Sequence, residues 1–184
     1  MTIFLIVGLP GAGKTTRAKE LEVSESALRL TPDDWQMAVF HRDGPTRWRS
    51  QERADQRDQL EGKLVEVGMR AARLGIDVVL DFGLWSRDER AALRWMADSL
   101  GVRSQVVYLP IDLDEQRWRI THRYQSTSGH FRMSDTELQQ WQVQFQPPDQ
   151  DELHGSAIPA APGNSTWWRW ARERWPSLPE EPFS

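Results

Sequence analysis

This chain of 184 residues contains no cysteine, and it has no apolar stretch long enough to cross a membrane. The first absence excludes disulfide bridges and thiolate metal sites, and it makes the cytoplasm the expected compartment. The second excludes a helical membrane span, which needs about 20 consecutive apolar residues. The first eight residues are apolar but lack the basic start and cleavage site of a signal peptide. The sequence therefore predicts a soluble cytoplasmic protein with no membrane partner.

Lysine is scarce, and positive charge does not exceed negative charge. Three of the 23 basic residues are lysine, and the formal net charge is −4. Such a balance argues against sequence-independent nucleic-acid binding through a broad basic surface, although it leaves room for a local basic groove. The length predicts one domain over residues 1–184, because domains commonly contain about 100 to 200 residues.

Residues 8–15 match a complete phosphate-binding loop, G-x-x-x-x-G-K-[ST], directly after the apolar run of residues 3–7. In such a loop backbone N–H groups surround the phosphates of a nucleotide. The lysine, here Lys14, reaches the β- and γ-phosphate oxygens, and the hydroxyl, here that of Thr15, ligates Mg²⁺. The expected cofactors are therefore ATP or GTP and Mg²⁺. The residues expected to bind the nucleotide in this loop are Leu9, Pro10, Gly11, Ala12, Gly13, Lys14, Thr15 and Thr16.

Apolar runs alternate with helical patterns along most of the chain. Strands are predicted at residues 2–8, 27–30, 76–82 and 104–109, with at most a short fifth strand near 156–160. Between them, apolar residues recur at helical spacing and capping boxes open two of the helices. The alternation predicts an α/β fold with the three-layer P-loop architecture, in which helices cover both faces of a mostly parallel sheet of four or five strands.

The last part of the chain has a different composition. Residues 117–137 predict a helical lid, because arginines flank a Ser/Gly-bearing stretch between two helical patterns. Residues 146–184 predict an irregular linker followed by a terminal helix over 165–175, and a base-reading loop is expected near 156–164. The terminal helix carries four tryptophans. Packing onto the domain is the favoured interpretation of these tryptophans, and a partner surface is the alternative.

Several classes of nucleotide-binding protein lack support in this sequence. A GTPase would need the guanine-reading pattern Asn-Lys-x-Asp, which is absent, and a motor-type ATPase usually has an acidic pair where this chain has Asp81-Phe82. His41-Arg42-Asp43 and Asp81-Phe82-Gly83 look like protein-kinase signatures, but G-x-G-x-x-G and V-A-I-K are missing. Kinases of small molecules or nucleic acids and nucleotide-dependent binding modules remain.

Two carboxylates stand at the predicted carboxyl edge of the sheet, where a phosphoryl acceptor would bind. Asp33 lies just beyond the second predicted strand, and Asp81 ends the third. Kinase chemistry needs a carboxylate near the acceptor hydroxyl, Mg²⁺ on the phosphates and cations on the migrating group. Asp33 fits the first role, although its surroundings also read as an ordinary helix start. Asp81 could hold Mg²⁺, bond the acceptor or bond a loop N–H.

The motifs occur in a specific order along the chain. The phosphate loop is followed by the Asp33-Asp34-Trp35 segment, by Leu80-Asp81 with Arg90, and by the Arg-rich segment 117–123. In this order the chain resembles the AAA_33-type P-loop kinases over about residues 1–145. That group is similar to the kinase domain of polynucleotide 5′-hydroxyl kinases, to chloramphenicol phosphotransferase and to zeta-toxin kinases.

The resemblance implies roles for individual residues. Asp33 would be the general base, with Lys14 on the phosphates and Thr15 on Mg²⁺. Asp81 and Arg90 would lie on the acceptor side. The lid arginine that reaches the phosphates would be Arg119 or Arg123.

Two departures from polynucleotide kinases concern the acceptor. Those enzymes have Asp-Thr-Asn where this chain has Asp81-Phe82-Gly83, and they commonly carry an arginine where this chain has Gln36. Trp35 and Trp85 could instead wall an apolar or aromatic acceptor, with core packing as the alternative for each. The sequence thus favours an ATP-dependent phosphotransferase that acts on a hydroxyl of a small molecule. A nucleic-acid 5′-hydroxyl kinase and a binding module with little or no transfer are the alternatives.

Overall fold

The computed structural model describes residues 1–40, 51–126 and 134–183, and a parallel sheet with the strand order β2-β3-β1-β4 forms its centre. The strands are β1 (Thr2–Val7), β2 (Leu28–Leu30), β3 (Val78–Gly83) and β4 (Arg103–Tyr108). Strand β1 is buried along its whole length, as expected for a continuous apolar strand covered on both faces. The four predicted strands and the α/β class are confirmed.

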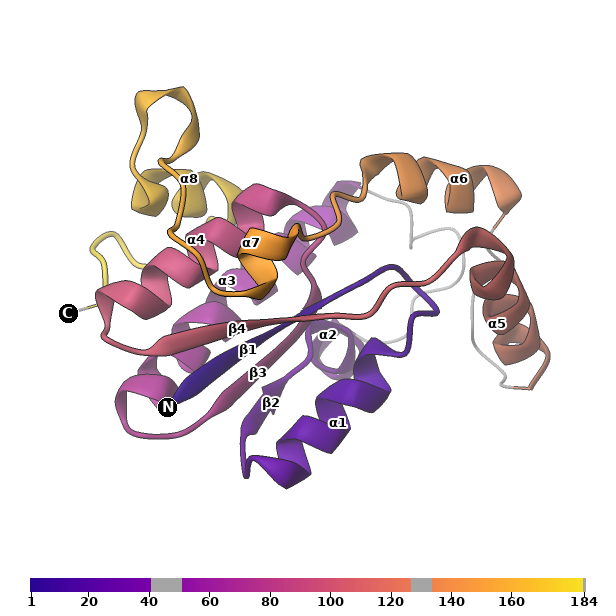
Figure 1. The fold of residues 1–184 in the computed structure, drawn as a ribbon, viewed down its shortest axis with the longest axis horizontal. Coiled ribbons are helices and arrows are strands. Elements are labelled where there is room, and N and C mark those ends of the chain that lie inside the picture. Colours follow the sequence, from indigo (N-terminus) through magenta and orange to yellow (C-terminus); the bar gives the residue numbers. More distant parts are fainter. Residues whose placement is uncertain (41–50, 127–133, 184) are drawn as a thin grey trace.

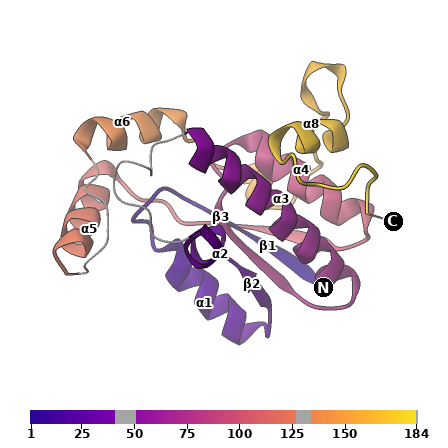
Figure 2. The same ribbon diagram turned by 180° about the vertical axis from the view of Figure 1, so that it is seen from behind.

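Helices cover both faces of the sheet (Figures 1 and 2). Helix α1 lies on one face, α3 and α4 lie on the other, and α8 packs outside α4. Helices α5 and α6 stand beyond the carboxyl ends of the strands. The helical elements are α1 (Lys14–Ser24), α2 (Pro32–Phe40), α3 (Gln51–Arg73), α4 (Arg87–Ser99), α5 (Leu113–Ser126), α6 (Asp135–Gln144), α7 (Gln150–Leu153), the 3₁₀ turn η2 (Pro162–Asn164) and α8 (Trp167–Arg174).

The two faces of β1 supply two hydrophobic clusters, because successive side chains of a strand point to opposite faces. Phe4 and Ile6 pack with Ala18 and Leu21 of α1. The residues between them, such as Leu5, join a larger cluster that extends through α3 and α4 to α8. The phosphate loop follows β1 directly. Because β1 is buried along its whole length, it holds the start of the loop in place.

The predicted end of the third strand needs a small correction. Strand β3 runs to Gly83, so Asp81 lies inside it and does not end it. Gly83 has φ +93°, a left-handed conformation that favours glycine, and the next residue, Leu84, also has a positive φ of 41°. The chain thus turns sharply two residues after Asp81.

The predicted fifth strand is wrong. Residues 156–160, all of them described, form no strand. Their backbone carbonyls bond to side chains instead: that of Ser156 accepts from Arg94 of α4, and that of Pro159 accepts from the indole N–H of Trp167. Pro159 also has no N–H to give to a strand ladder.

The terminal helix is confirmed, and it belongs to the core. Thr166 caps α8, whose predicted range was 165–175. Trp167, Trp168 and Trp175 are buried in the large hydrophobic cluster. Their indole N–H groups all find acceptors, as buried tryptophans require. The structure therefore favours packing over a partner surface for these three side chains.

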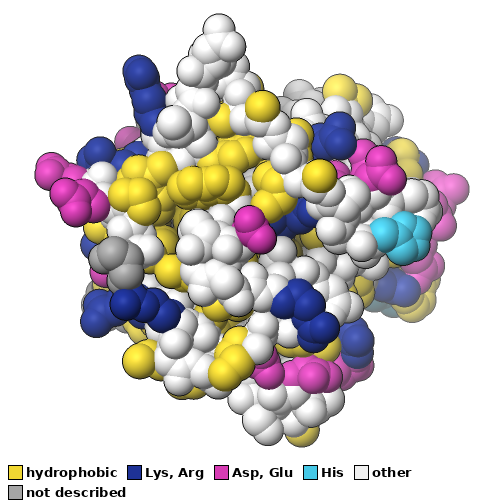
Figure 3. Space-filling model, turned by 60° about the vertical axis from the view of Figure 1, so that its left-hand side comes forward, with side chains coloured by type: hydrophobic (Ala, Val, Ile, Leu, Met, Phe, Trp, Pro, Cys, Tyr) yellow, Lys and Arg dark blue, Asp and Glu magenta, His cyan; other side chains and the backbone are white. Residues whose placement is uncertain are grey.

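Some expectations fall on residues outside the described ranges. These include the His41-Arg42-Asp43 tripeptide and the centre of the predicted lid at 127–133. Within the described ranges, no helix is both long and apolar enough to cross a membrane. On the face drawn in Figure 3, Lys and Arg side chains are dispersed among acidic and hydrophobic ones and form no continuous stripe.

Candidate active site

The phosphate loop has the backbone shape that its glycines predict. Gly8, Gly11 and Gly13 all have positive φ, and the amide of Ala12 donates to the carbonyl of Leu9. A Cβ at Gly8 would lie 2.8 Å from the carbonyl oxygen of Leu109, so the loop can approach β4 closely only without a side chain there. Helix α1 begins at Lys14 with a glycine as its N-cap, so no side chain covers its first N–H groups. Such a helix start favours an anion.

Lys14 lies against the turn that follows β3. Its ammonium donates to the carbonyl of Leu9 at 3.0 Å. A Cβ at Gly83 would lie 3.6 Å from Cε of Lys14, and the amide of Gly8 donates to the carbonyl of Gly83 at 3.3 Å. The end of β3 and the phosphate loop are thus bonded to each other around the lysine.

Asp81 and Thr15 meet through their side chains. The Thr15 hydroxyl hydrogen-bonds the Asp81 carboxylate, while Oδ2 of Asp81 is buried and has no hydrogen-bond partner in the described part of the chain. Burial raises the pKa of Asp81, and the Thr15 hydrogen bond and the Lys14 charge act in the opposite direction. An orphaned carboxylate oxygen beside a hydroxyl matches Mg²⁺, which takes a few protein oxygens together with water and phosphate. Among the described residues no cluster of three acidic or histidine side chains competes for the ion.

Asp33 lies in the first turn of α2, with 63% of its side chain exposed. Its carboxylate accepts a hydrogen bond from the guanidinium of Arg57 on α3. It is also close enough to Asp81 for its negative charge to contribute to the raised pKa of that residue. The neighbouring Asp34 has a different contact, an ion pair with Arg29 at 3.3 Å. The structure therefore brings Asp33 to the side of the site that holds Lys14, Thr15 and Asp81.

Helix α5 rests on the phosphate loop through one of its faces. Arg119 donates to the carbonyl of Gly11 at 3.2 Å and pairs with Glu115. Gln116 is fully buried, donates to the carbonyl of Pro10 at 2.9 Å and accepts from Gln142 of α6 at 3.1 Å. Sequence reasoning missed Gln116. Its spacing of three from Arg119 is the signal that could have found it, since residues i and i+3 share a helix face.

The arginines of α5 otherwise have separate places. Arg117 pairs with Asp135 at the start of α6 at 3.1 Å and so joins α5 to α6. The side chain of Arg123 lies outside the described part of the chain, as does all of Arg132. A contact of Arg119 or Arg123 with the phosphates stays a prediction. The neighbouring position of Arg119 on the loop is compatible with it.

Arg90 has protein partners for its whole guanidinium. It is completely buried, and Nε and Nη2 donate to both oxygens of Glu152 at 2.8 and 2.9 Å. Nη1 donates to the carbonyls of Leu84 and Trp85. The place of Arg90 on the acceptor side stays a prediction, and its burial does not favour it. The arrangement instead fixes the turn after β3 through a residue, Glu152, that the sequence did not single out.

The two candidate acceptor tryptophans differ. Trp35 is 47% exposed on α2. Trp85 is half-buried and packs edge-on against Trp141 of α6, with ring centroids 5.9 Å apart. The indole nitrogen of Trp85 lies 3.4 Å from where a Cβ of Gly83 would be. Trp85 is therefore close to the same glycine that Lys14 packs against, and both assignments stay predictions.

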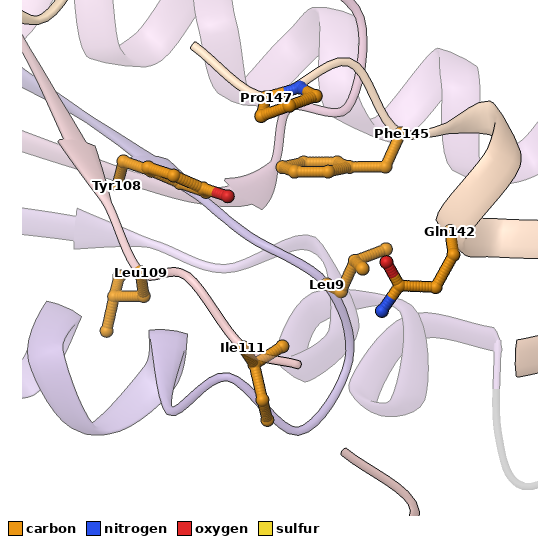
Figure 4. A pocket seen from close by; sticks show the side chains of 7 residues that line it. All are labelled: Leu9, Tyr108, Leu109, Ile111, Gln142, Phe145 and Pro147. Carbon is orange, nitrogen blue, oxygen red and sulfur yellow. The ribbon is translucent and has the colours of Figure 1, made fainter. Parts of the chain in front are cut away.

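A cavity of about 120 Å³ lies beside the phosphate loop (Figure 4). Its walls come from the loop, from the end of β4 and from α6 and the segment after it. They are Leu9, Tyr108, Leu109, Ile111, Gln142, Phe145 and Pro147. The lining is mostly apolar and aromatic, with the amide of Gln142 and the hydroxyl of Tyr108 as polar groups.

The segment expected to read the base lies elsewhere. Gly155, Ser156 and Ile158 line a separate hollow with Arg103 and Ser104, which are the first residues of β4. Parallel strands place their first residues at the opposite edge of the sheet from the phosphate loop. The expectation of a base-reading loop near 156–164 is therefore not supported.

Comparison with known proteins identifies the relatives of this arrangement. The AAA_33 family model, described as an AAA domain, matches residues 3–148. A gluconokinase from Sinorhizobium meliloti 1021 shares the fold with 16% identity and a TM-score of 0.54, over 96% of this chain and 91% of that one. Kti12 from Chaetomium thermophilum, solved with ADP-AlF3, shares it with 15% identity and a TM-score of 0.58, over 96% and 99%.

A third similar structure is a chain of the Pnkp1/Rnl/Hen1 RNA repair complex, with 16% identity and a TM-score of 0.57. The match covers 78% of this chain but only 43% of that one. No curated protein sequence matches this chain. At these identities the structural matches show a common fold, which is that of P-loop kinases.

Proposed function

The chain belongs to the AAA_33 family, and on this premise we propose that it is an ATP-dependent phosphotransferase that moves the γ-phosphoryl group to a hydroxyl of a small molecule. The observation that carries this proposal is the pair formed by Thr15 and Asp81, with its orphaned carboxylate oxygen beside Lys14. A phosphoryl-transfer site needs both a place for Mg²⁺ and a second carboxylate for the acceptor, and Asp33 supplies the second.

The chemical step follows from these positions. The acceptor oxygen attacks the γ-phosphorus in line, and the bond from that phosphorus to the β,γ-bridging oxygen breaks, so that ADP leaves. Asp33 orients the acceptor hydroxyl and receives its proton. Lys14 lies where its ammonium can leave the Leu9 carbonyl for a phosphate oxygen. Mg²⁺, held by Thr15 and Asp81, would neutralise charge on the β- and γ-phosphates.

Two features favour a small acceptor. The net charge is −4, which argues against a broad basic surface. A polynucleotide acceptor gains much of its affinity from phosphate contacts with such basic surfaces. The gluconokinase relative acts, by its name, on a small hydroxylated acid. The RNA repair relative is the reason to keep a nucleic-acid 5′-hydroxyl kinase as the second candidate.

A transfer assay with labelled ATP and Mg²⁺ tests the proposal. The acceptors are a panel of small hydroxylated compounds that includes gluconate, a 5′-hydroxyl RNA oligonucleotide, and water alone. We expect label in a small compound. Label in the RNA alone would favour the second candidate. ATP binding with only slow hydrolysis across the panel would show a nucleotide-dependent binding module.

The role of Asp33 has a matched control in its neighbour. Asp33→Asn should keep ATP affinity within about twofold and lower transfer by about 10²- to 10⁴-fold, since it removes a general base. Asp34→Asn changes the adjacent carboxylate, which pairs with Arg29, and should leave transfer near the wild-type rate. Transfer at the wild-type rate by the Asp33→Asn protein would overturn the base assignment.

A further inference from the structure

A chain of alternating charges runs from the candidate base to the C-terminal helix. Asp33 on α2 accepts from Nη1 of Arg57 on α3, and Nε of Arg57 donates to Oε1 of Glu61 at 2.8 Å. Oε2 of Glu61 then accepts from Nη2 of Arg174 on α8 at 3.2 Å. We call these four residues, Asp33, Arg57, Glu61 and Arg174, the ion-pair chain.

The far end of the ion-pair chain is firmly held. Nη1 of Arg174 donates to Asp58 at 2.6 Å, and its Nε donates to Glu89 at 2.7 Å, so all three guanidinium nitrogens have carboxylate partners. Glu89 also forms the capping box of α4. Arg174 therefore fixes three helices relative to one another, namely α3, α4 and α8.

Within the ion-pair chain Glu61 is buried, so its carboxylate needs the neighbouring cations. Burial raises the pKa of Glu61, whereas the charges of Arg57 and Arg174 favour its ionised form. The indole N–H of Trp175 adds a third donor to Glu61 at 3.2 Å. Close packing supports these contacts, since a Cβ at Gly62 would lie 2.3 Å from the hydroxyl oxygen of Ser177. A buried carboxylate that loses one of its cations leaves an uncompensated charge.

The near end depends on the middle. In the described part of the chain, Arg57 is the side chain that hydrogen-bonds Asp33, whose own carboxylate is largely exposed. A guanidinium is planar, so two simultaneous contacts, to Glu61 and to Asp33, fix its orientation. Without Glu61, Arg57 could follow Asp33 into solvent and would no longer direct it.

From this geometry we propose that Arg57 is a positioning residue for Asp33 and that the C-terminal segment, through Arg174 and Glu61, sets the orientation of Arg57. This inference rests on the proposed function, in which Asp33 handles the acceptor hydroxyl. The proposal gives α8, which lies far from the phosphate loop, an indirect part in the transfer step. The segment contributes no group that touches substrate.

The test compares two arginines of α8. Arg174→Gln removes the end of the ion-pair chain, while Arg169→Gln removes an exposed arginine of the same helix that pairs only with Glu173. Transfer is measured with the best acceptor of the panel above, or with water where no other acceptor is labelled. We expect Arg174→Gln to lower kcat on the order of tenfold with KM for ATP within about twofold, and Arg169→Gln to behave as wild type.

A double-mutant comparison separates positioning from general damage. In an Asp33→Asn background, Arg174→Gln should have no further effect on transfer, because both changes act through the same carboxylate. An equal loss in both backgrounds would mean that Arg174 acts only on the fold, and it would overturn the proposal. A wild-type kcat in the Arg174→Gln protein would overturn it as well.

A second variant covers the case in which Arg174→Gln fails to fold. Arg57→Lys keeps the charge and the apolar stem but replaces the planar fork by a point charge. It should give the same fall in kcat in the wild-type background and the same lack of effect beside Asp33→Asn. If Asp33→Asn impairs transfer but Arg57→Lys does not, the positioning role is wrong while the proposed function stands. If Asp33→Asn itself is unimpaired, the base assignment and the positioning role are both wrong, although the transfer reaction itself would stand.

Discussion

The proposed nucleotide end and the proposed acceptor end of this site are held by contacts that span very different numbers of residues along the chain. Within the phosphate loop, Lys14 bonds to a carbonyl 5 residues away, and the helix it opens needs only a glycine before it. At the acceptor end, Asp33 is held by an arginine 24 residues away, and Glu61 bonds to a tryptophan 114 residues away. One short motif therefore specifies the nucleotide end. The acceptor end forms only after helices that are distant in the sequence have packed together.

The largest effect should come from the nucleotide end. Lys14→Ala removes the cation nearest the phosphates and should lower transfer on the order of 10³- to 10⁵-fold, the range seen when one cation of a phosphoryl-transfer site is lost. The fold should persist, because the loop shape is set by its backbone. Labelled-ATP transfer and a thermal unfolding curve measure the two halves of this prediction. The control is Lys19→Ala, which changes an exposed lysine of the same helix. More than a tenth of wild-type activity in the Lys14→Ala protein would contradict the prediction.

The buried contact that fixes the turn after β3 should show its effect on stability. Glu152→Ala leaves the fully buried Arg90 without its carboxylate and should cost about 3–5 kcal/mol of unfolding free energy, as breaking a buried ion pair does. Glu173→Ala removes the partner of an exposed arginine and should cost less than about 1 kcal/mol. Urea denaturation compares the two. Equal costs would show that the Arg90 pair is not the anchor that its burial suggests.

A smaller effect on stability, of opposite sign, is expected at Asp81, where substitution should stabilise the fold. Burial raises the pKa of Asp81, so the folded protein holds this proton to a higher pH than the unfolded chain does. The free energy of unfolding therefore falls as the pH rises from the pKa of Asp81 in the unfolded chain through its higher pKa in the folded protein. At neutral pH the ionised carboxylate destabilises the nucleotide-free fold. Asp81→Asn should raise the unfolding temperature at pH 7 while lowering transfer by about 10²-fold.

The control for that variant is Asp98→Asn, an exposed position on α4, which should change neither quantity. Differential scanning calorimetry at pH 7 without nucleotide gives the first quantity. A lower unfolding temperature in the Asp81→Asn protein would mean that the carboxylate stabilises the fold, and the interpretation of its orphaned oxygen would have to be abandoned.

The sequence was sufficient for the strands and for the phosphate loop because both can be recognised from runs of neighbouring residues. An apolar run predicted β1, and glycine spacing predicted the loop that follows it. The partners of Arg90 and Asp33 could not be predicted in this way. Glu152 and Arg57 look like ordinary charged residues, and nothing periodic connects them to residues 62 and 24 positions away.

The fifth strand failed for a related reason. In residues 156–160 only Ile158 favours a strand, and tertiary contacts with Arg94 and Trp167 take the carbonyls of Ser156 and Pro159. Local propensity for strands is weak, and side-chain packing overrides it. Gln116 shows the intermediate case. Its helix face was predictable from its spacing, but its role as the bond between the phosphate loop and α6 needed the fold.

The burial of Trp175 and Arg174 has a consequence for how the protein matures in the cell. The ribosome releases the phosphate loop and the whole sheet before it releases α8, and domains begin to fold from their N-terminal part during synthesis. Until α8 emerges, the large hydrophobic cluster lacks Trp167 and Trp175, and Glu61 has Arg57 as a partner but not Arg174. A nascent chain would therefore present its nucleotide-binding loop before α8 completes the hydrophobic cluster that it shares with α3 and α4.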